Sequence, residues 1–281
     1  MSYMVRNEEA LSDHQLRAIA PAIFAEQEHD SRSDRYAFVP TSAIVGGLRK
    51  EGFQPVWAAA CKTRSADRKS HSKHMIRFRR EGELVAGSIP EVVLVNSHDG
   101  SSSYQLHAGA FRFICANGMI VPEGMAHVVR VKHTGNILDN VIEGSFTVVK
   151  EADEALQEAS EWQGIPLKPD VQEAFAEMAL HARFGTSEED PRKADTNVTV
   201  QQMLRARRAE DRDHQGPFAK RDVFHTFQTL QENAMKGGIL TIDPETQRRN
   251  RTRPVQGIDQ TVGVNKQLAF LAKMFADKFG N

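Results

Sequence analysis

The spacing of hydrophobic residues changes near residue 135, and this change constrains the fold of the 281-residue chain more than any other feature. Between Gln54 and His133, apolar and polar residues alternate in segments such as QPVWAAACK, KHMIRFRR, PEVVLVN and SYQLHAGAFRFICA, which is typical of β-strands. Beyond Gly135, apolar residues recur every three or four positions, which is typical of amphipathic helices. We therefore expect an α+β fold, with an antiparallel β-sheet with hairpins at about residues 54–133 flanked by helices and a helical C-terminal half.

Two dipeptides are expected to turn the chain between neighbouring strands. Asp99-Gly100 and Asn117-Gly118 each lie between strand-like segments, and both tolerate the positive φ angles of tight hairpin turns. On this interpretation FRFICANGMIV is a hairpin whose Asn-Gly turn fixes the register of its strands. Arg112 is then its one candidate functional side chain.

Helices are expected both before and after the sheet segment in the sequence. In LSDHQLRAIAPAIFA, Ser12 or Asp13 caps a helix that Pro21 bends or ends, and Thr41 is the N-cap of a short helix in TSAIVGGLRKEGF. After the sheet we expect one long helix over residues 136–162, and a helix that starts with a capping box of Asp170 and Glu173. Three more helices are predicted in TVQQMLRARRAEDRDH, RDVFHTFQTLQENAMKGG and VNKQLAFLAKMFADKF.

Residues 185–198, which begin GTSEEDPRKADTN, form the best candidate linker because Gly, Pro, Asp and Ser cluster there without hydrophobic periodicity. The sequence thus divides into an α+β core domain (residues 1–184) and a helical C-terminal region (residues 199–281), which could pack on the core.

Composition narrows the classes of protein to which the chain could belong. Its 36 Lys and Arg oppose 37 Asp and Glu, so any basic surface depends on how charges are distributed. Two cysteines, Cys61 and Cys115, favour reduced thiols in a cytoplasm, and no apolar segment is long enough to cross a membrane. No phosphate-binding glycine-rich loop or dinucleotide fingerprint is present. These features argue against an ATPase or dehydrogenase, and we expect no cofactor.

The densest basic segment is CKTRSADRKSHSKHMIRFRR, in which Asp67 is the only acidic residue. If MIRFRR is a strand, Arg77 and Arg79 share one face, and a row of guanidinium groups can follow the phosphates of a nucleic acid. The alternative is a solvated loop and an edge strand that positive charge protects from aggregation. The candidate phosphate-binding residues here are Lys62, Arg64, Arg68, Lys69, Lys73, Arg77, Arg79 and Arg80, with Arg112 from a neighbouring strand.

Two smaller basic clusters follow. TQRRNRTRP holds Arg248, Arg249, Arg251 and Arg253 without an acidic residue and is expected to close the same groove. LRARR is expected to place Arg205 and Arg208 on one helical face, where a solvated surface is the simpler interpretation. Nearby aromatic side chains that could stack on unpaired bases are Trp57, Phe78, Tyr104, Phe111 and Phe113, although strand aromatics are commonly core residues.

The segment NSHDG offers the only candidate for catalysis. His98 and Asp99 could act as a base and its orienting partner, with Arg112 stabilising charge in a transition state. The same residue types are typical of a hairpin turn, which we favour. His71 and His74 lack a second pair of ligands, and Cys115 lies in an apolar run, so we expect no metal site.

Several segments together resemble a known family. VGGLRKEGFQPV, KHMIRFRR, VVLVNSHDGSSSYQLHAGAFRFICANGMIV and RPVQGIDQTVGVNKQLAFLAKMF look like successive blocks of the phage- and plasmid-associated domain of unknown function 932. The resemblance implies residence on mobile elements beside proteins of DNA repair, recombination or evasion of restriction. No catalytic role comes with it. The family pattern maps onto His74, Arg77, Asn96, Ser97, His98, Asp99, Gly100, Gly109, Phe111, Arg112, Cys115, Asn117 and Gly118.

Together, these features lead us to expect a nucleic-acid-binding protein of a mobile element, with single-stranded DNA as the favoured partner in recombination or replication. Phage annealing proteins are similar in outline, so a homo-oligomer is compatible with this expectation. One alternative is a metal-dependent nuclease centred on NSHDG. The other is an antirestriction or regulatory factor that docks a protein partner through Leu268, Leu271, Met274 and Phe275, a helical pattern that is also typical of core.

Overall fold

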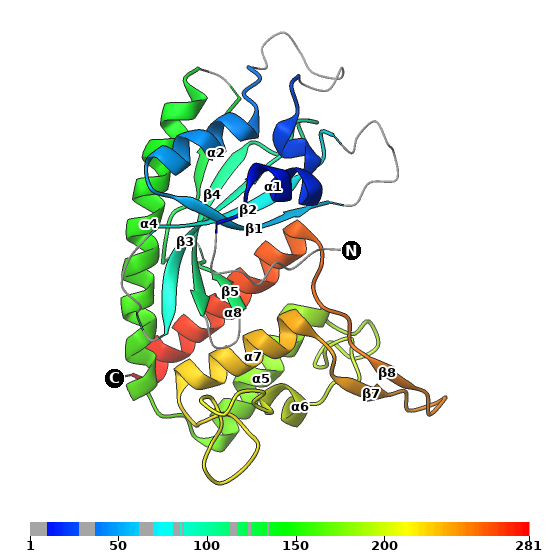
Figure 1. The fold of residues 1–281 in the computed structure, drawn as a ribbon. Helices are drawn as coiled ribbons and strands as arrows, with labels where there is room; N and C mark the ends of the chain where they lie inside the picture. The colour runs from blue at the N-terminus through cyan, green and yellow to red at the C-terminus, as the bar shows by residue number, and fades with distance from the viewer. Residues whose placement is uncertain are drawn as a thin grey trace. The chain divides into compact units, whose positions relative to one another are not determined.

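The computed structural model confirms the change from sheet to helix expected near residue 135 (Figure 1). It describes residues 10–27, 37–61, 70–80, 85, 87–112, 117–122, 125–133 and 135–280. The chain forms two compact units, one of Met1–Arg112 and Glu123–Leu156, the other of Phe113–Pro122 and Gln157–Asn281. The fold class is α+β, as expected. The proposed linker at residues 185–198 lies inside the second unit, between two of its helices.

The sheet is antiparallel and has six strands, in the order β1-β2-β3-β4-β5, with β6 also paired to β4. The strands are β1 (Gln54–Ala60), β2 (His74–Arg79), β3 (Ser88–Asn96), β4 (Tyr104–Arg112), β5 (Asn117–Ile120) and β6 (Val129–Val131). The turn between β3 and β4 contains Gly100 with φ of 75°, so the hairpin expected at Asp99-Gly100 is confirmed. Every residue of β3 is buried, which makes it the central strand of the core.

Helices of the first unit cover the sheet (Figure 1). They are α1 (Asp13–Ile19), the 3₁₀ helix η1 (Pro21–Phe24), α2 (Thr41–Lys50) and α4 (Ile137–Glu161), whose last residues belong to the second unit. Ser12 caps α1 through a capping box with Gln15, and the helix ends before Pro21, as expected. The expected cap of α2 is wrong: Pro40 is the N-cap and Thr41 is the first helical residue, so its hydroxyl is available for other contacts.

The second unit is mainly helical. Besides β5, its elements are η2 (Trp162–Gly164), α5 (Pro169–Phe184), α6 (Val200–Leu204), α7 (Val223–Lys236), the two-stranded sheet β7 (Leu240–Ile242) and β8 (Arg249–Arg251), and α8 (Ile258–Phe279). Phe175 of α5 stacks on Phe275 of α8 at 4.5 Å between ring centroids, and Trp162 meets Phe227 of α7 edge-on at 5.9 Å. Aromatic packing therefore joins α5 to α8 and η2 to α7.

Three local predictions are wrong. Asn117 and Gly118 are the first residues of β5 and so do not form the expected turn. The cap of α5 is Lys168 without a side-chain hydrogen bond, so Asp170 and Glu173 form no capping box. The helix expected over TVQQMLRARRAEDRDH ends at Leu204, because the chain then forms bridges from Arg205 to Phe218 and from Arg212 to Ala219.

Among the described residues, no helix combines the length and apolarity needed to cross a membrane.

Candidate nucleic-acid interface

Buried polar side chains of the first unit converge on the hydroxyl of Thr41. His74 Nε2 and His98 Nε2 each lie 3.0 Å from Thr41 Oγ1, and Asn96 Nδ2 donates to the same oxygen at 3.2 Å. Tyr104 donates its hydroxyl proton to Val39 O at 2.9 Å and lies 3.3 Å from Thr41 Oγ1. This cluster, which we call the Thr41 cluster, joins the start of α2 to β2, β3 and β4.

The hydrogen bonds fix the protonation of this cluster. Burial lowers the pKa of His74 to about 4, and burial followed by the neighbouring histidines lowers the pKa of His98 to about 3, so both are neutral near pH 7. Because Nδ1 of His74 donates to Ser72 O, its Nε2 accepts the Thr41 proton. Thr41 then accepts from His98 Nε2. This leaves His98 Nδ1 and Asn96 Oδ1 as buried acceptors without a partner among the described residues.

Thr41 and His74 thus form a hydroxyl–imidazole pair of the kind that activates nucleophiles, but both have zero exposure to solvent. In the candidate catalytic pair, His98 has the same limitation, whereas Asp99 is half-buried. His98 is fully buried in the cluster, and Asp99 accepts from Ser101 N at 2.9 Å, which stabilises the turn. Within the described residues, no three His, Cys, Asp or Glu side chains are placed to hold a metal ion.

The first basic cluster is largely engaged within the protein where it is described. Arg77 Nη1 donates to Glu91 Oε2 at 2.8 Å, and Arg79 Nε donates to Glu91 Oε1 at 2.7 Å. The two arginines share a sheet face, as expected, but their side chains are only 7% and 11% exposed. Glu91, fully buried opposite them, was missed in the sequence because its role depends on strand register.

The other members of that cluster lie in different surroundings. Arg112 is buried, Lys73 is half-buried, and exposed Arg80 lies over the rings of Phe53 and Phe146. The four remaining candidates fall outside the described residues: Lys62, Arg64, Arg68 and Lys69. The described side chains therefore supply mainly internal contacts.

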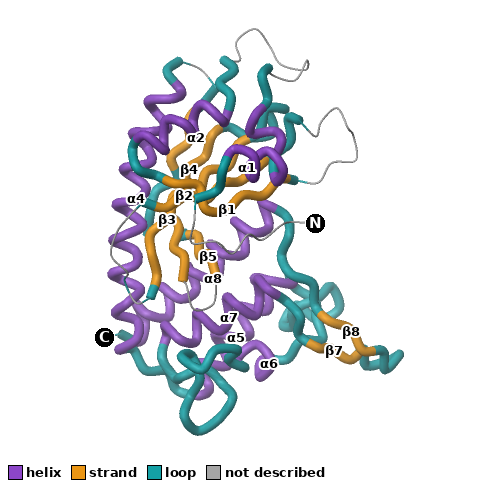
Figure 2. Tube along the Cα trace, viewed as in Figure 1, coloured by secondary structure: helices purple, strands orange, loops and turns teal. Residues whose placement is uncertain are grey.

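The second basic cluster is exposed on a projecting hairpin of the second unit, formed by β7, β8 and their connection (Figure 2). We call residues 238–253 the arm. All four of its predicted arginines are exposed: Arg248, Arg249, Arg251 and Arg253. The side chains of Arg248, Arg249 and Arg253 make no hydrogen bond or ion pair with any described residue, and that of Arg251 donates once, to Gly238 O at 2.9 Å. The arm contains four arginines and only two acidic residues.

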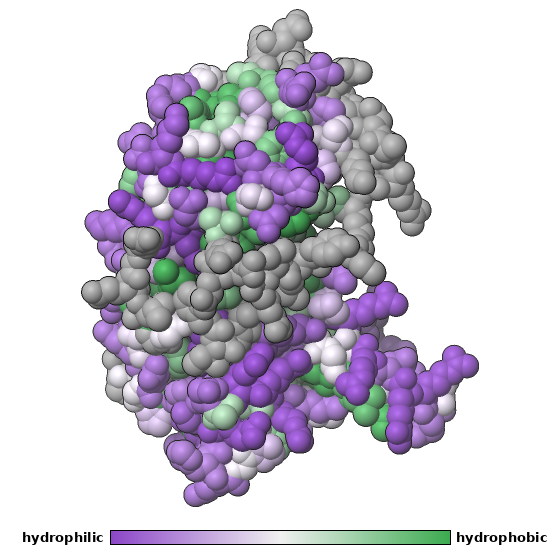
Figure 3. Space-filling view, viewed as in Figure 1, coloured by the Kyte–Doolittle hydropathy of each residue, from purple (hydrophilic) through white to green (hydrophobic). Residues whose placement is uncertain are grey.

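The register of the arm sorts its side chains onto two faces. Leu240 lies opposite Arg251 and Ile242 opposite Arg249, so these four side chains share one face. Thr241 and Asn250 form the opposite face. Leu240 is 40% and Ile242 49% exposed, and Figure 3 shows apolar surface beside polar surface on the arm. Alternation in LTI and RNR was the missed signal for this hairpin.

The turn of the arm is built by Asp243. Its Oδ1 accepts from Glu245 N at 3.1 Å and from Thr246 N at 2.7 Å, and these backbone hydrogen bonds lower the pKa of the carboxyl group. Gln247 closes the turn with a positive φ of 54°.

The base of the arm is anchored to α7. Gly237 ends α7 with φ of 58°, and a Cβ there would come within 2.6 Å of the Arg253 carbonyl carbon. Arg183 donates from Nε to Ala234 O and from Nη2 to Arg253 O, at 2.9 and 3.0 Å. Arg207 donates to Gly237 O and Asn233 Oδ1. Half-buried Arg183 and exposed Arg207 thus fix the base through these hydrogen bonds, whereas Arg248, Arg249 and Arg251 extend along the arm.

The third basic cluster does not form a helical face, because Arg205 and Arg208 follow the end of α6. Arg208 instead pairs with the buried Glu232 at 2.8 Å. The predicted docking face of α8 is mostly core: Leu268, Leu271 and Phe275 are buried, whereas Met274 is 37% exposed.

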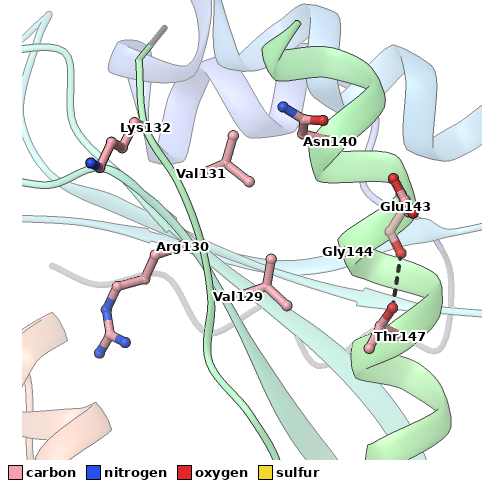
Figure 4. A pocket seen from close by; sticks show the side chains of 8 residues that line it. All are labelled: Val129, Arg130, Val131, Lys132, Asn140, Glu143, Gly144 and Thr147. Atoms are coloured by element: carbon pink, nitrogen blue, oxygen red, sulfur yellow. Dashed lines mark hydrogen bonds between the residues drawn. The ribbon is translucent and has the colours of Figure 1, made fainter. Parts of the chain in front are cut away.

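A groove of about 440 Å³ lies between β6 and α4. Val129 and Val131 point toward the helix, while Arg130 and Lys132 point away from it (Figure 4). A Cβ on Gly144 would lie 2.8 Å from Val129 Cγ1, so glycine permits the close approach of α4 to β6. The wall that faces the helix is thus apolar, and the two cations are directed out of the groove.

The fold and these sites define an α+β protein of two units, the second of which carries an arginine-rich arm. The chain belongs to the family described as "Domain of unknown function (DUF932)", whose model matches residues 28–269. It is similar to the UPF0380 proteins YafZ and YfjQ of Escherichia coli strain K12, each 37% identical over 270 residues that cover 96% of this chain and 93% of the relative. No solved structure matches the chain.

Proposed function

We propose that this protein binds nucleic acid through the arm of the second unit. The observation that carries the proposal is the exposure of Arg248, Arg249, Arg251 and Arg253 on a hairpin whose base is fixed to α7. Arginine donates to two phosphate oxygens at once, and two-stranded ribbons are a common means of contacting nucleic acid. A fixed base lowers the entropic cost of ordering these side chains on binding.

The family resemblance supports a setting for this activity. We propose that the protein acts in the cytoplasm on the nucleic acid of a mobile element, during recombination or replication, and that catalysis is not required. Assembly into a homo-oligomer is compatible with this function because one arm offers few phosphate contacts, and several arms on one strand would add their affinities.

The test compares two double variants of the same arm. R249A/R251A removes two exposed guanidinium groups, and T241A/N250A changes the opposite face without altering charge. Titration of a fluorescent oligonucleotide at low salt should show binding about tenfold weaker for R249A/R251A and little changed for T241A/N250A. Equal affinity of R249A/R251A and the unmodified protein would refute phosphate binding by this face.

A further inference from the structure

The face of the arm that carries Arg249 and Arg251 also exposes two large aliphatic side chains. Leu240 and Ile242 are 40% and 49% exposed, although the rest of the second unit buries most of its large apolar residues. Both belong to β7, which is held by regular pairing with β8. Exposed aliphatic side chains on an ordered element are typical of binding surfaces.

The register sets what kind of ligand fits this face. Side chains directly opposite in an antiparallel pair have Cβ atoms about 5 Å apart, so each aliphatic side chain has an arginine beside it. A matching ligand therefore has two adjacent units, each with a negative group and an apolar surface at that spacing. Consecutive unpaired nucleotides do so, because each has a phosphate and an accessible base face, whereas a duplex stacks its base faces inside.

Two other occupants fit less well. A second copy of the same face would place arginines against arginines. No negative charge is supplied by the four residues of this face: Leu240, Ile242, Arg249 and Arg251. An anionic membrane would attract the arginines, but residues 238–253 contain no aromatic side chain to enter the lipid interface.

We propose that this face of the arm binds unpaired nucleotides, with Leu240 and Ile242 against bases and Arg249 and Arg251 on the adjoining phosphates. The inference rests on the proposed function and adds the selection of single strands over duplex. Contact with bases is apolar and does not release counterions, so it persists at high salt, where phosphate contacts weaken.

The test uses L240T/I242T, in which β-branched polar residues keep the strand propensity of the arm. Affinities for a mixed-sequence single strand and for its duplex are measured over a range of salt, and circular dichroism checks the fold. The unmodified protein should prefer the single strand. L240T/I242T should lose about tenfold in single-strand affinity, including at high salt, with an unchanged salt dependence and an unchanged affinity for duplex.

Other results would overturn the inference. Equal or tighter binding of duplex by the unmodified protein would contradict the inference and leave the proposed function standing, whereas no binding of either nucleic acid would contradict both. If L240T/I242T binds the single strand normally, the inference is wrong. A smaller assembly in sedimentation would then identify a second copy as the occupant, and lost binding to phosphatidylserine vesicles would identify a membrane.

Discussion

Glu91 is the residue on which the internal role of the first basic cluster depends. It is fully buried and accepts hydrogen bonds from both Arg77 and Arg79. Glu91→Gln keeps the shape of the side chain and leaves two buried guanidinium groups without their carboxylate. We predict a loss of about 3–5 kcal/mol in the free energy of unfolding, measured by urea denaturation.

The matched control is Asp13→Asn, which breaks the exposed pair of Asp13 with Arg49. Asp13→Asn should lower the free energy of unfolding by less than about 1 kcal/mol. Similar losses for the two variants would show that Glu91 does not hold a buried ion pair.

The histidines of the Thr41 cluster predict sensitivity to mild acid. An unfolded histidine has a pKa of about 6.5, whereas the pKa of His74 is about 4 and that of His98 about 3 in the folded protein. The unfolded chain therefore binds more protons below pH 6.5, and stability falls as the pH drops from about 6.5 toward 4. Between pH 6.5 and 5, these two histidines should together take up at most about two protons on unfolding. This proton uptake sets their contribution to the slope of the free energy of unfolding against pH.

Urea denaturation at several pH values measures this slope, and His14→Gln, which alters an exposed histidine, should leave it unchanged. Stability that is constant between pH 7 and 5 would contradict the neutral, buried state of His74 and His98.

At the residue scale, the sequence predicted which side chains share a strand face but not their partners. Alternation placed Arg77 beside Arg79 correctly. Their pairing with Glu91 depends on the register between β2 and β3, and the approach of His98 to Thr41 depends on the docking of α2. Both are long-range contacts that local spacing does not encode.

At the scale of elements, the arm depends on the close approach of its return strand to Gly237. Gly237→Ala would place a Cβ 2.6 Å from the Arg253 carbonyl carbon, at φ of 58°. We predict that the free energy of unfolding, measured by thermal or urea denaturation, falls by about 1–3 kcal/mol, because backbone atoms cannot move aside as a flexible side chain can. Gly216→Ala is the control, since a Cβ at Gly216 meets nothing within 4 Å. Equal stability of the two variants would contradict the tight crossing at the base of the arm.

Long elements were predicted better than short ones. The helix at Ile137–Glu161 and the helix at Val223–Lys236 follow from periodicity sustained over many residues. Asn117-Gly118 was misassigned because the same dipeptide is tolerated in a strand. The helix after Thr199 was predicted too long because helix-forming residues continue past Leu204, where tertiary bridges at Arg205 and Arg212 override propensity.

At the scale of the whole molecule, the nearly neutral balance of 36 basic and 37 acidic residues conceals a strongly uneven distribution. Arg77 and Arg79 are paired inside the first unit, whereas the four arginines of the arm are exposed on the second. The sequence located the arm's basic cluster but not its form as a hairpin. Charge content alone does not distinguish internal cations from surface cations, because that depends on tertiary packing.

The most direct test of the central claim is the salt dependence of single-strand binding by the unmodified protein and by R249A/R251A. If both arginines contact phosphates, the slope of log K against log salt concentration should become shallower by about 1.4 in the variant, that is, about 0.7 for each lost contact. Parallel lines for the two proteins, with no change in slope, would contradict the account.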